Sequence, residues 1–532
     1  MNNITFDVLT QPWIPVRMQS GSDKEFGLYE LFENAHNIKE LLEPSPLIRY
    51  GIMRLLVAFV TDVFRPKNRD DLIALIDAGS FDMEKIRRYV SACKNEMGNG
   101  CFDLFDDKRP FLQSAYDERY DKNEEKSFWS VATLTKEIPK GNNHIHFVHR
   151  IEDEHEYCPA VCARGLCAVN VFALSGGQGY SPGINDLPPW FILVKRSSLF
   201  ESVLFNTLCE KQIENSELEK NLYNPPVTWR DGTVVVPKQV IPATSYLRGL
   251  TWTARRISLL PVARRGICTY SGKESDVLIR KIRYTWGWNS KSLKGRWRDP
   301  HVGYCINNKG EVKSIKPSSE SSAWRDLGGL VFTEDSVPAN VKQCIDIMRK
   351  RDEKIRDIEL ELYSMITEGG NEKVHEWFSE TFSLKFEVID SNYKCREVKT
   401  MIQKTEAAAD ALKKQLNSVF LGMLENKSKS RGKMSEKSIF LSQVQIEFFS
   451  QMREYFFDDF LPQLAGVDTE DEDWVPKLHE SVNKAIWTRT MSVFNRFSQM
   501  LCSDASTITA MVEAENRLRI ALSKILPKKE GE

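Results

Sequence analysis

The feature that most constrains the fold is a long stretch, from about residue 390 to residue 526, in which proline and glycine are rare. Its apolar residues recur at intervals of three and four, as in Phe420, Met423 and Leu424, which is the stripe that a helix buries against its neighbours. This pattern predicts helices at roughly 393–425, 436–462, 471–502 and 504–526. Four helices of this length predict an antiparallel four-helix bundle over residues 386–532.

The sequence before residue 386 mixes both kinds of secondary structure. Apolar periodicity predicts helices over PLIRYGIMRLLVAFVTDVF and MEKIRRYVSACKNEM, whereas ITFDVL and WFILV have the composition of strands. A further helix is expected at roughly 338–366, ending before Gly369 and Gly370. The fold class is therefore predicted to be α+β, with a large mixed α/β domain at 1–385 followed by the bundle.

Composition bounds the class of protein. With 41% hydrophobic and 28% charged residues and a formal net charge of −1, the chain has an ordinary globular composition. The first residues show no basic segment followed by an apolar core, and the longest apolar run, LLVAFV, is too short to cross a bilayer. We therefore expect a cytoplasmic protein without membrane contact. The 11 cysteines are an odd number, which favours reduced thiols over a disulfide framework.

Positive charge is concentrated between Arg230 and Asp299. This stretch holds 15 lysines and arginines but four acidic residues, and tyrosines and tryptophans are interleaved with the cations. Cations neutralise phosphates, and aromatic faces stack on exposed bases, so the combination favours a nucleic-acid surface. Each aromatic residue taken singly is equally explained as part of a core.

A glycine-rich stretch, SGGQGYSPG, occupies residues 175–183 between two apolar segments. Glycine is used where φ is positive or where a ligand or another backbone comes close. The spacing of Gly177, Gly179 and Gly183 is one residue too long for the dinucleotide-binding fingerprint, and no P-loop lysine follows. The stretch is either a plain turn between buried segments or a loop whose backbone approaches a ligand.

Motifs for catalysis and metal binding are incomplete. His144, His146, His149 and His155 precede Cys158 and Cys162, but neither the zinc deaminase signature nor HExxH is present. No G-x-S-x-G elbow occurs either. We therefore predict a protein that is not an enzyme and that needs no metal or other cofactor. A metal-dependent hydrolase built on the His144–Cys162 cluster remains an alternative.

A resemblance emerges from several separate stretches that occur in order along the chain. Besides the glycine loop they are WIPV at 13–16, FDLFDDKRPFLQ at 102–113, CPAVCARGL at 158–166, SYLRGLTW at 245–252, RWRDPHVGY at 296–304 and SAWRDLGGLVF at 322–332. Together with the helical tail, they resemble the CasA-type large subunit of Cascade, the type I-E CRISPR surveillance complex. The resemblance covers nearly the whole chain.

The resemblance implies a non-catalytic subunit that reads the protospacer-adjacent motif of double-stranded DNA from the minor groove. It then opens the duplex so that the guide RNA can pair and an R-loop can form. The minor groove is only about 6 Å wide, which suits a loop without side chains. Gly177, Gln178 and Gly179 are the implied reading loop. Lys281 or Arg283, on the neighbouring hairpin, is the implied basic partner in this readout.

Two further contacts are implied by the same resemblance. The family's wedge, which separates the strands, corresponds to Gly370 and Asn371 in TEGGNEKVHEW, although asparagine is shorter than the usual glutamine. Phe147 in HIHFVHR corresponds to the loop that touches the 5′ handle of the guide RNA, where it would stack on a base.

The implied partners are guide RNA, the other Cascade subunits, the target DNA and an effector nuclease. A lysine-rich connection between the first two tail helices is expected to be a loop that contacts the DNA backbone, through Lys427, Lys429, Arg431 and Lys433. Many family members hold a zinc ion with two cysteine pairs, but Val161 and Ser271 replace one cysteine of each pair here, so no zinc is expected. A structural adaptor without sequence readout remains a second alternative.

Overall fold

The computed structural model describes most of the chain, and every structural statement below concerns the described part. The chain divides into two compact units. The first unit comprises residues 1–317, 337–353 and 358–382, and the second comprises residues 318–336, 354–357 and 383–532. The described residues are 4–138, 154–175, 180–213, 222–307, 309–317, 323–332, 336–351, 357–367, 374–425, 431–467, 474–501 and 505–527.

The first unit is built around one buried helix, α2 (Pro46–Phe64). Its first turn is fixed by Ser45, whose hydroxyl accepts the N–H of Ile48, and by a proline at the first helical position. Almost all of its side chains are buried, which explains the uninterrupted apolar sequence. At Gly51 the helix meets α5 (Pro159–Val169) so closely that an added Cβ would lie 2.7 Å from the carbonyl carbon of Cys167.

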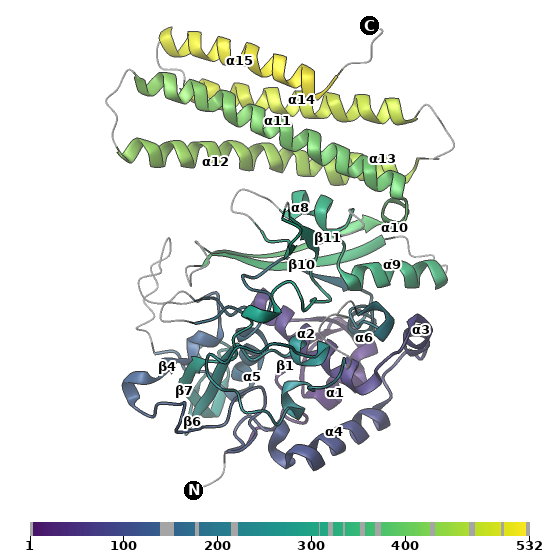
Figure 1. The fold of residues 1–532 in the computed structure, drawn as a ribbon, viewed down its shortest axis with the longest axis vertical. Helices are drawn as coiled ribbons and strands as arrows, with labels where there is room; N and C mark the ends of the chain where they lie inside the picture. Colours follow the sequence, from purple (N-terminus) through teal and green to yellow (C-terminus); the bar gives the residue numbers. More distant parts are fainter. Residues whose placement is uncertain are drawn as a thin grey trace. The chain divides into compact units, whose positions relative to one another are not determined.

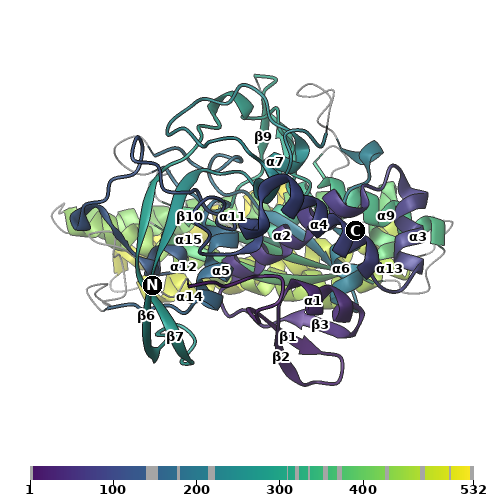
Figure 2. The same cartoon turned by 90° about the horizontal axis from the view of Figure 1, so that it is seen from below.

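Short sheets and helices surround α2 (Figures 1 and 2). Strand β1 (Ile14–Met18) lies between β2 (Asp23–Phe26) and β3 (Ile38–Leu41), and both neighbours are antiparallel to it. The strands β8 (Tyr304–Ile306) and β9 (Val312–Ser314) form a second antiparallel pair. The remaining helices of the first unit are α1 (Leu28–Asn34), α3 (Arg69–Asp77), α4 (Met83–Met97), α6 (Leu199–Phe205), α7 (Tyr246–Leu250) and α9 (Ala339–Arg351).

A long antiparallel hairpin dominates the basic region. Its strands are β6 (Arg255–Ile267) and β7 (Glu274–Trp286), and Figure 2 shows them running side by side. The short strand β4 (Trp129–Ser130) pairs with β7 and completes a sheet with the order β4-β7-β6. The register shifts between Leu260 and Pro261, where proline lacks the N–H that a regular ladder needs.

The helix expected at 338–366 is wrong in its second half. Helix α9 ends at Arg351, and residues 357–367 form strand β10 (Asp357–Thr367). In this segment Ile358, Leu360 and Leu362 are buried and alternate with glutamates, which is the period of a strand. β10 lies between β5 (Phe191–Lys195) and β11 (Val374–Lys385). The strand expected at ITFDVL is also absent from the described residues 4–9, which contain only an isolated bridge from Asp7 to Asp103.

The second unit contains a bundle of four long helices, drawn in green and yellow in Figure 1. They are α11 (Asn392–Glu425), α12 (Arg431–Glu454), α14 (Trp474–Leu501) and α15 (Ala505–Ile525). A π-helical turn (Tyr455–Phe460) connects α12 to α13 (Leu461–Ala465), just before Pro462 interrupts the hydrogen-bond ladder. The unit also includes α8 (Ala323–Leu330) and α10 (Phe386–Ile389). The α+β fold class is thus confirmed, and residues 318–336 group with the bundle rather than with the preceding sequence.

Candidate nucleic-acid interface

The two basic residues predicted to read DNA lie on one face of strand β7. Side chains alternate along a strand, so Lys281 and Arg283 point away from Ile282 and Tyr284, which are buried. The Lys281 ammonium lies 2.6 Å from the carboxylate of Glu125. Its side chain is 39% exposed and that of Glu125 is 83% exposed. An ion pair this exposed is weak, so Lys281 is available to another anion.

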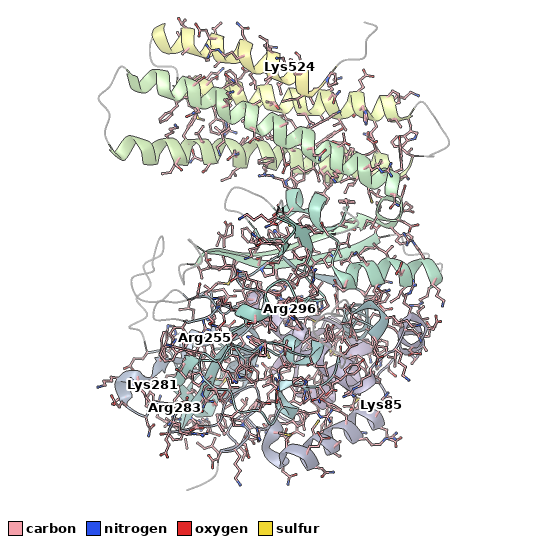
Figure 3. All side chains as sticks on the ribbon, viewed as in Figure 1. Lys85, Arg255, Lys281, Arg283, Arg296 and Lys524 are labelled. Atoms are coloured by element: carbon pink, nitrogen blue, oxygen red, sulfur yellow. The ribbon has the colours of Figure 1, made fainter. Side chains whose placement is uncertain are left out.

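Arg283 is held much more firmly. Its guanidinium donates a hydrogen bond of 2.7 Å to the side-chain oxygen of Asn123 and lies 4.6 Å from the centre of the Tyr116 ring. The ring of Phe128 lies on it as well, at 5.5 Å. These contacts keep the side chain on the protein surface. Lys281 and Arg283 are both labelled in Figure 3. A ligand would have to displace fewer contacts at Lys281 than at Arg283.

The glycine loop is described at its two ends. Gly177, Gln178 and Gly179 lie outside the described residues, so their role stays a prediction. The N–H of Gly183 donates to the carbonyl of Ala173 at 2.8 Å, which brings the two ends of the loop together. A Cβ on Gly183 would lie 2.9 Å from the carbonyl oxygen of Val171. The fourth glycine of the motif is therefore required by packing at the base of the loop.

A buried arginine connects both ends of the loop. Arg255, the first residue of β6, is 1% exposed, and its guanidinium donates to the carbonyls of Leu174 and Ser181. Leu174 precedes the first three glycines of the motif, and Ser181 follows them and precedes Gly183. The same guanidinium donates to the hydroxyl of Tyr284. One side chain thus fixes the spacing of the loop ends and links them to the hairpin; its position is labelled in Figure 3.

Aromatic rings extend this link. The ring of Tyr180 lies 5.3 Å from that of Trp286 and 6.1 Å from that of Tyr284, on the buried face of β7. Trp129 of β4 contacts both Tyr180 and Tyr284. Tyr284 and Trp286 of the basic region therefore support the loop, which agrees with the interpretation of such residues as core.

Five cations of the hairpin are paired with carboxylates of the same chain. Each of five lysines and arginines has a carboxylate partner that comes, with one exception, from a distant part of the sequence. The pairs are Arg264 with Glu156, Arg265 with Glu274, Lys273 with Glu25, Arg280 with Glu154 and Lys281 with Glu125. The number of cations in this part of the sequence therefore overstates the net positive charge of the surface.

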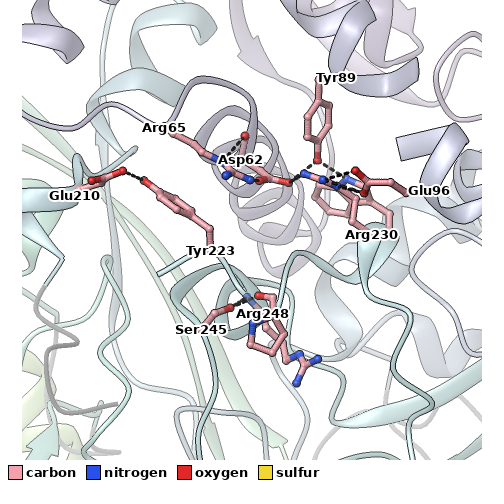
Figure 4. Close-up of polar contacts among 11 residues, drawn as sticks. Asp62, Arg65, Tyr89, Glu96, Glu210, Tyr223, Arg230, Ser245 and Arg248 are labelled. Carbon is pink, nitrogen blue, oxygen red and sulfur yellow. Dashed lines mark hydrogen bonds and ion pairs between the residues drawn. The ribbon is translucent and has the colours of Figure 1, made fainter. Parts of the chain in front are cut away.

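Other arginines of the same region stabilise the interior (Figure 4). Arg230 bridges Asp62 and Glu96, and Tyr89 donates a third contact to the buried Asp62 carboxylate. Arg248 pairs with Asp231 at 2.6 Å. Arg256 pairs with Asp121 and is buried as well. Arg248 and Arg256 are both buried and paired, so the expectation of a nucleic-acid surface is wrong for these two residues.

Two thiols occupy the position of the family's zinc site. Cys158, at the start of α5, and Cys268, in the turn of the hairpin, are hydrogen-bonded to each other. This bond, together with one from Ser271, lowers the pKa of Cys268, while the pKa of Cys158 is raised. Among the described residues no group of three or more histidine, cysteine, aspartate or glutamate side chains could hold a metal ion. The hydrogen bond between the two thiols links the hairpin turn to the start of α5.

The structure does not describe most of the other residues that were predicted to make contacts. Phe147, Gly370 and Asn371, and also Lys427 and Lys429, lie outside the described residues. Arg431 and Lys433 belong to the first turn of helix α12, so the expectation that they lie in a loop is wrong. Residues 368–373 connect β10 to β11, which are neighbours in one sheet, and the proposed wedge lies in this connection.

Sequence reasoning missed the roles of Arg255 and Tyr180. Arg255 is one of the many cations of the basic region, and no local pattern distinguishes it from Arg256 beside it. Its partners lie 74 to 81 residues away, so their proximity follows from the fold alone.

The described helices include none with the length and apolar character of a membrane span.

Comparisons with known proteins agree with this architecture. Residues 7–493 match the family model of the CRISPR-associated protein Cse1. A CRISPR-associated protein CasA/Cse1 from Thermus thermophilus is 28% identical over 334 residues, which is 61% of this chain and 60% of that protein. The chain thus matches less than two thirds of the length of this relative.

Solved structures show the same fold over nearly the full length. Cse1 from Acidimicrobium ferrooxidans superposes with a TM-score of 0.74 at 19% identity and covers 99% of both chains. CasA from Thermus thermophilus gives 0.72 at 19% identity, with 98% of this chain and 99% of that one covered. Cse1 from Thermobifida fusca gives 0.71 at 16% identity and covers 98% of each. The chain therefore belongs to the CRISPR-associated Cse1 family, which confirms its resemblance to the CasA-type large subunit.

Proposed function

We propose that this protein is the large subunit of an RNA-guided CRISPR surveillance complex and that it recognises the protospacer-adjacent motif of double-stranded DNA. It acts without catalysis, as one component beside the guide RNA and other subunits. Reading occurs in the minor groove, through the loop at residues 177–179, with Lys281 as the basic partner. Duplex opening at Gly370 and Asn371 lets the guide pair and presents the target to an effector nuclease.

The observation that carries the proposal is the double hydrogen bond from Arg255 to the carbonyls of Leu174 and Ser181. A loop that merely reverses the chain has no need for a buried guanidinium at its base. Burying that charge is costly unless it is hydrogen-bonded, and here each of the three guanidinium nitrogens donates to an oxygen. A loop with fixed ends loses less conformational entropy when it enters a narrow groove, which favours a recognition role.

Lys281 is the preferred basic residue for electrostatic reasons. Within the described part of the chain its carboxylate partner is the exposed Glu125, so a DNA acceptor replaces that partner at little cost. Arg283 would first have to leave Asn123 and two aromatic rings. The family membership supports the general role, and this difference supports the choice between the two residues.

The test is selection of duplexes by the reconstituted guide-RNA complex, with and without this chain, from a library randomised beside a fixed matching target. A short flanking motif should be enriched only when the chain is present. Bulky residues at Gly177 and Gly179 should abolish the enrichment, whereas a change at Gly232, in an unrelated loop, should leave it intact. Equal recovery of all flanks would contradict the proposal and favour a structural adaptor.

A further inference from the structure

The first unit contains a cavity lined by lysines. Its first lining residues follow the glycine loop directly in the sequence. Its volume is about 240 Å³, and three segments of chain meet around it. One segment follows Gly183, the loop-base residue; the second precedes Trp297; the third is the β8–β9 pair. The lining residues that matter are Asp186, Lys294, Trp297, Tyr304, Lys313 and Lys316.

The charges in this lining are unbalanced. The ammonium groups of Lys294 and Lys316 lie 2.6 Å and 3.3 Å from the same carboxylate oxygen of Asp186. Lys313 is a third cation in the lining, and its nearest carboxylate, that of Glu311, is 3.6 Å away and 60% exposed. Three lysines thus face one lining carboxylate. Burial lowers the pKa of Lys316, and the positive charges of Lys294 and Lys313 lower it further, because like charges repel one another.

The walls of the cavity are fixed, while two of its lysine side chains reach solvent. Gly295 has a φ of +71°, and a Cβ there would lie 2.8 Å from the carbonyl oxygen of Val312, so the Lys294 segment is seated tightly on β9. Trp297 is buried against Gly249. Asn185 donates to Asp299, which forms a buried ion pair with Arg54. Lys294 and Lys313, by contrast, are 63% and 59% exposed.

Size and charge together select a small anion. Pockets for drug-sized ligands measure roughly 300–1,000 Å³, so this cavity suits one compact group. A carboxylate oxygen shared by two ammonium groups marks the place where a phosphate oxygen would also be bound. The lining continues from the base of the loop that we assign to the minor groove, where a duplex presents its phosphates.

We propose that this cavity binds one backbone phosphate of the target duplex, through Lys294 and Lys316, with Lys313 at its mouth. The proposal rests on the proposed function, since the duplex bound at the loop supplies the phosphate. A phosphate contact fixes the register of a protein on DNA and carries no sequence information. The cavity would therefore position the duplex, and the loop would read it.

The first test measures binding of target duplexes by the assembled guide-RNA complex at several salt concentrations. K294Q and K316Q should each weaken binding by about three- to tenfold, equally for all flanking motifs, and lower the slope of log affinity against log salt by about 0.9. K39Q, at an exposed lysine of β3, is the matched control and should leave affinity and slope unchanged. Wild-type slopes in both cavity variants would overturn the proposal, as would a loss restricted to one flank.

D186N gives a prediction of opposite sign. Asparagine tolerates the left-handed backbone of residue 186, where φ is 67°, so the fold is preserved. Removal of the carboxylate frees both lysines, and duplex binding should tighten by about threefold or more. Weaker binding by D186N would contradict a phosphate site.

A final experiment distinguishes binding of a DNA backbone phosphate from binding of a free phosphate ion. Inorganic phosphate is titrated onto the complete chain, and the signals of Lys294 and Lys316 are followed by NMR after methylation of the lysines with a carbon-13 label. Shifts at millimolar phosphate, together with weakened duplex binding by K294Q and K316Q, support the proposal. Shifts with unchanged duplex binding overturn the assignment to DNA. If the flanking library shows no enrichment but the salt slopes fall as expected, the reading role fails and the phosphate site stands.

Discussion

The guanidinium of Arg255 lies 4.8 Å from the centre of the Tyr180 ring. Arg255 begins β6, and Tyr180 follows Gly179 directly in the sequence, so this contact joins the hairpin to the loop. A guanidinium over an aromatic face gains up to about 2 kcal/mol when both are shielded from water. The loop that we propose as the DNA reader is thus attached to the sheet that carries Lys281.

The first prediction concerns this attachment. R255K keeps the charge, but an ammonium cannot reproduce the planar fork that reaches the carbonyls of Leu174 and Ser181. We expect loss of flank selection in the library experiment together with a lower melting temperature. R256K is the matched control, because Arg256 is equally buried but bonds to Asp121 instead of the loop. It should lower stability and keep flank selection; loss of selection in both variants would attribute the effect to instability.

The second prediction ranks the two basic residues of β7. K281Q should weaken binding to duplexes with the preferred flank by about tenfold, since one charged hydrogen bond to DNA is lost. R283Q should act mainly on the melting temperature, because Arg283 packs on Tyr116 and Phe128. E125Q releases Lys281 and should raise the association rate at low salt. Stopped-flow binding at two salt concentrations measures these changes, and the reverse order of K281Q and R283Q would contradict the ranking.

The third prediction tests the crossing of α2 and α5. G51A places a methyl group against the backbone of Cys167 and Ala168, and neither helix can yield easily. The free energy of unfolding should fall by about 1–3 kcal/mol, as for other overpacked interiors. G232A is the control, because the nearest atoms to its added methyl group are 3.7 Å away. Its stability should be unchanged or slightly raised, and equal stability of the two variants would refute the close crossing.

The fourth prediction is a pH dependence at His301. Burial lowers the pKa of this histidine to about 4, and its ring nitrogens are within hydrogen-bond distance of the Tyr50 hydroxyl and the Asn206 carbonyl. In the unfolded chain the value is about 6.5, so below this pH the unfolded state binds a proton that the folded state refuses. Stability is therefore lost as the pH falls from about 6.5 towards 4.

Urea unfolding at pH 7 and pH 5 measures this effect. The wild type should lose about 2 kcal/mol at His301 between the two pH values, in addition to the changes from other groups. H301Q retains hydrogen-bonding capacity without a proton equilibrium and should show a smaller loss. If wild type and variant showed the same pH dependence, the pKa of His301 would have to be the same in the folded and unfolded states. This result would contradict the prediction.

Local features of the fold could be predicted from the sequence, and long-range ones could not. The helix PLIRYGIMRLLVAFVTDVF forms α2 with the predicted bounds, because Ser45 and Pro46 mark its start and the apolar run continues to Phe64. The helix predicted up to residue 366 is wrong beyond α9, since the alternating glutamates and apolar residues of β10 follow closely on the true helix. The four long helices of the bundle could be predicted for the same reason as α2, because their length and apolar periodicity are visible in the sequence.

The candidate site shows the same division. The spacing of the glycines drew attention to the loop, and the family resemblance implied Lys281 or Arg283, but neither could rank those two residues. Their partners, Glu125 and Asn123, are 156 and 160 residues distant. The clamp by Arg255 and the cavity around Lys294 likewise arise from segments that only the tertiary fold brings together.

The carboxylate partners of the hairpin cations have a consequence for how DNA would be discriminated. Each pair, such as Lys273 with Glu25 or Arg265 with Glu274, has to be exchanged before a phosphate can bind. A single passing phosphate gains little from such an exchange, because exposed pairs and exposed phosphate contacts are of similar strength. A duplex held in register offers several phosphates at once and makes the exchanges together. Under the proposed function, the small costs of these exchanges would add up to a threshold, so the protein would pass over most of the DNA it meets and pause only where the groove also fits.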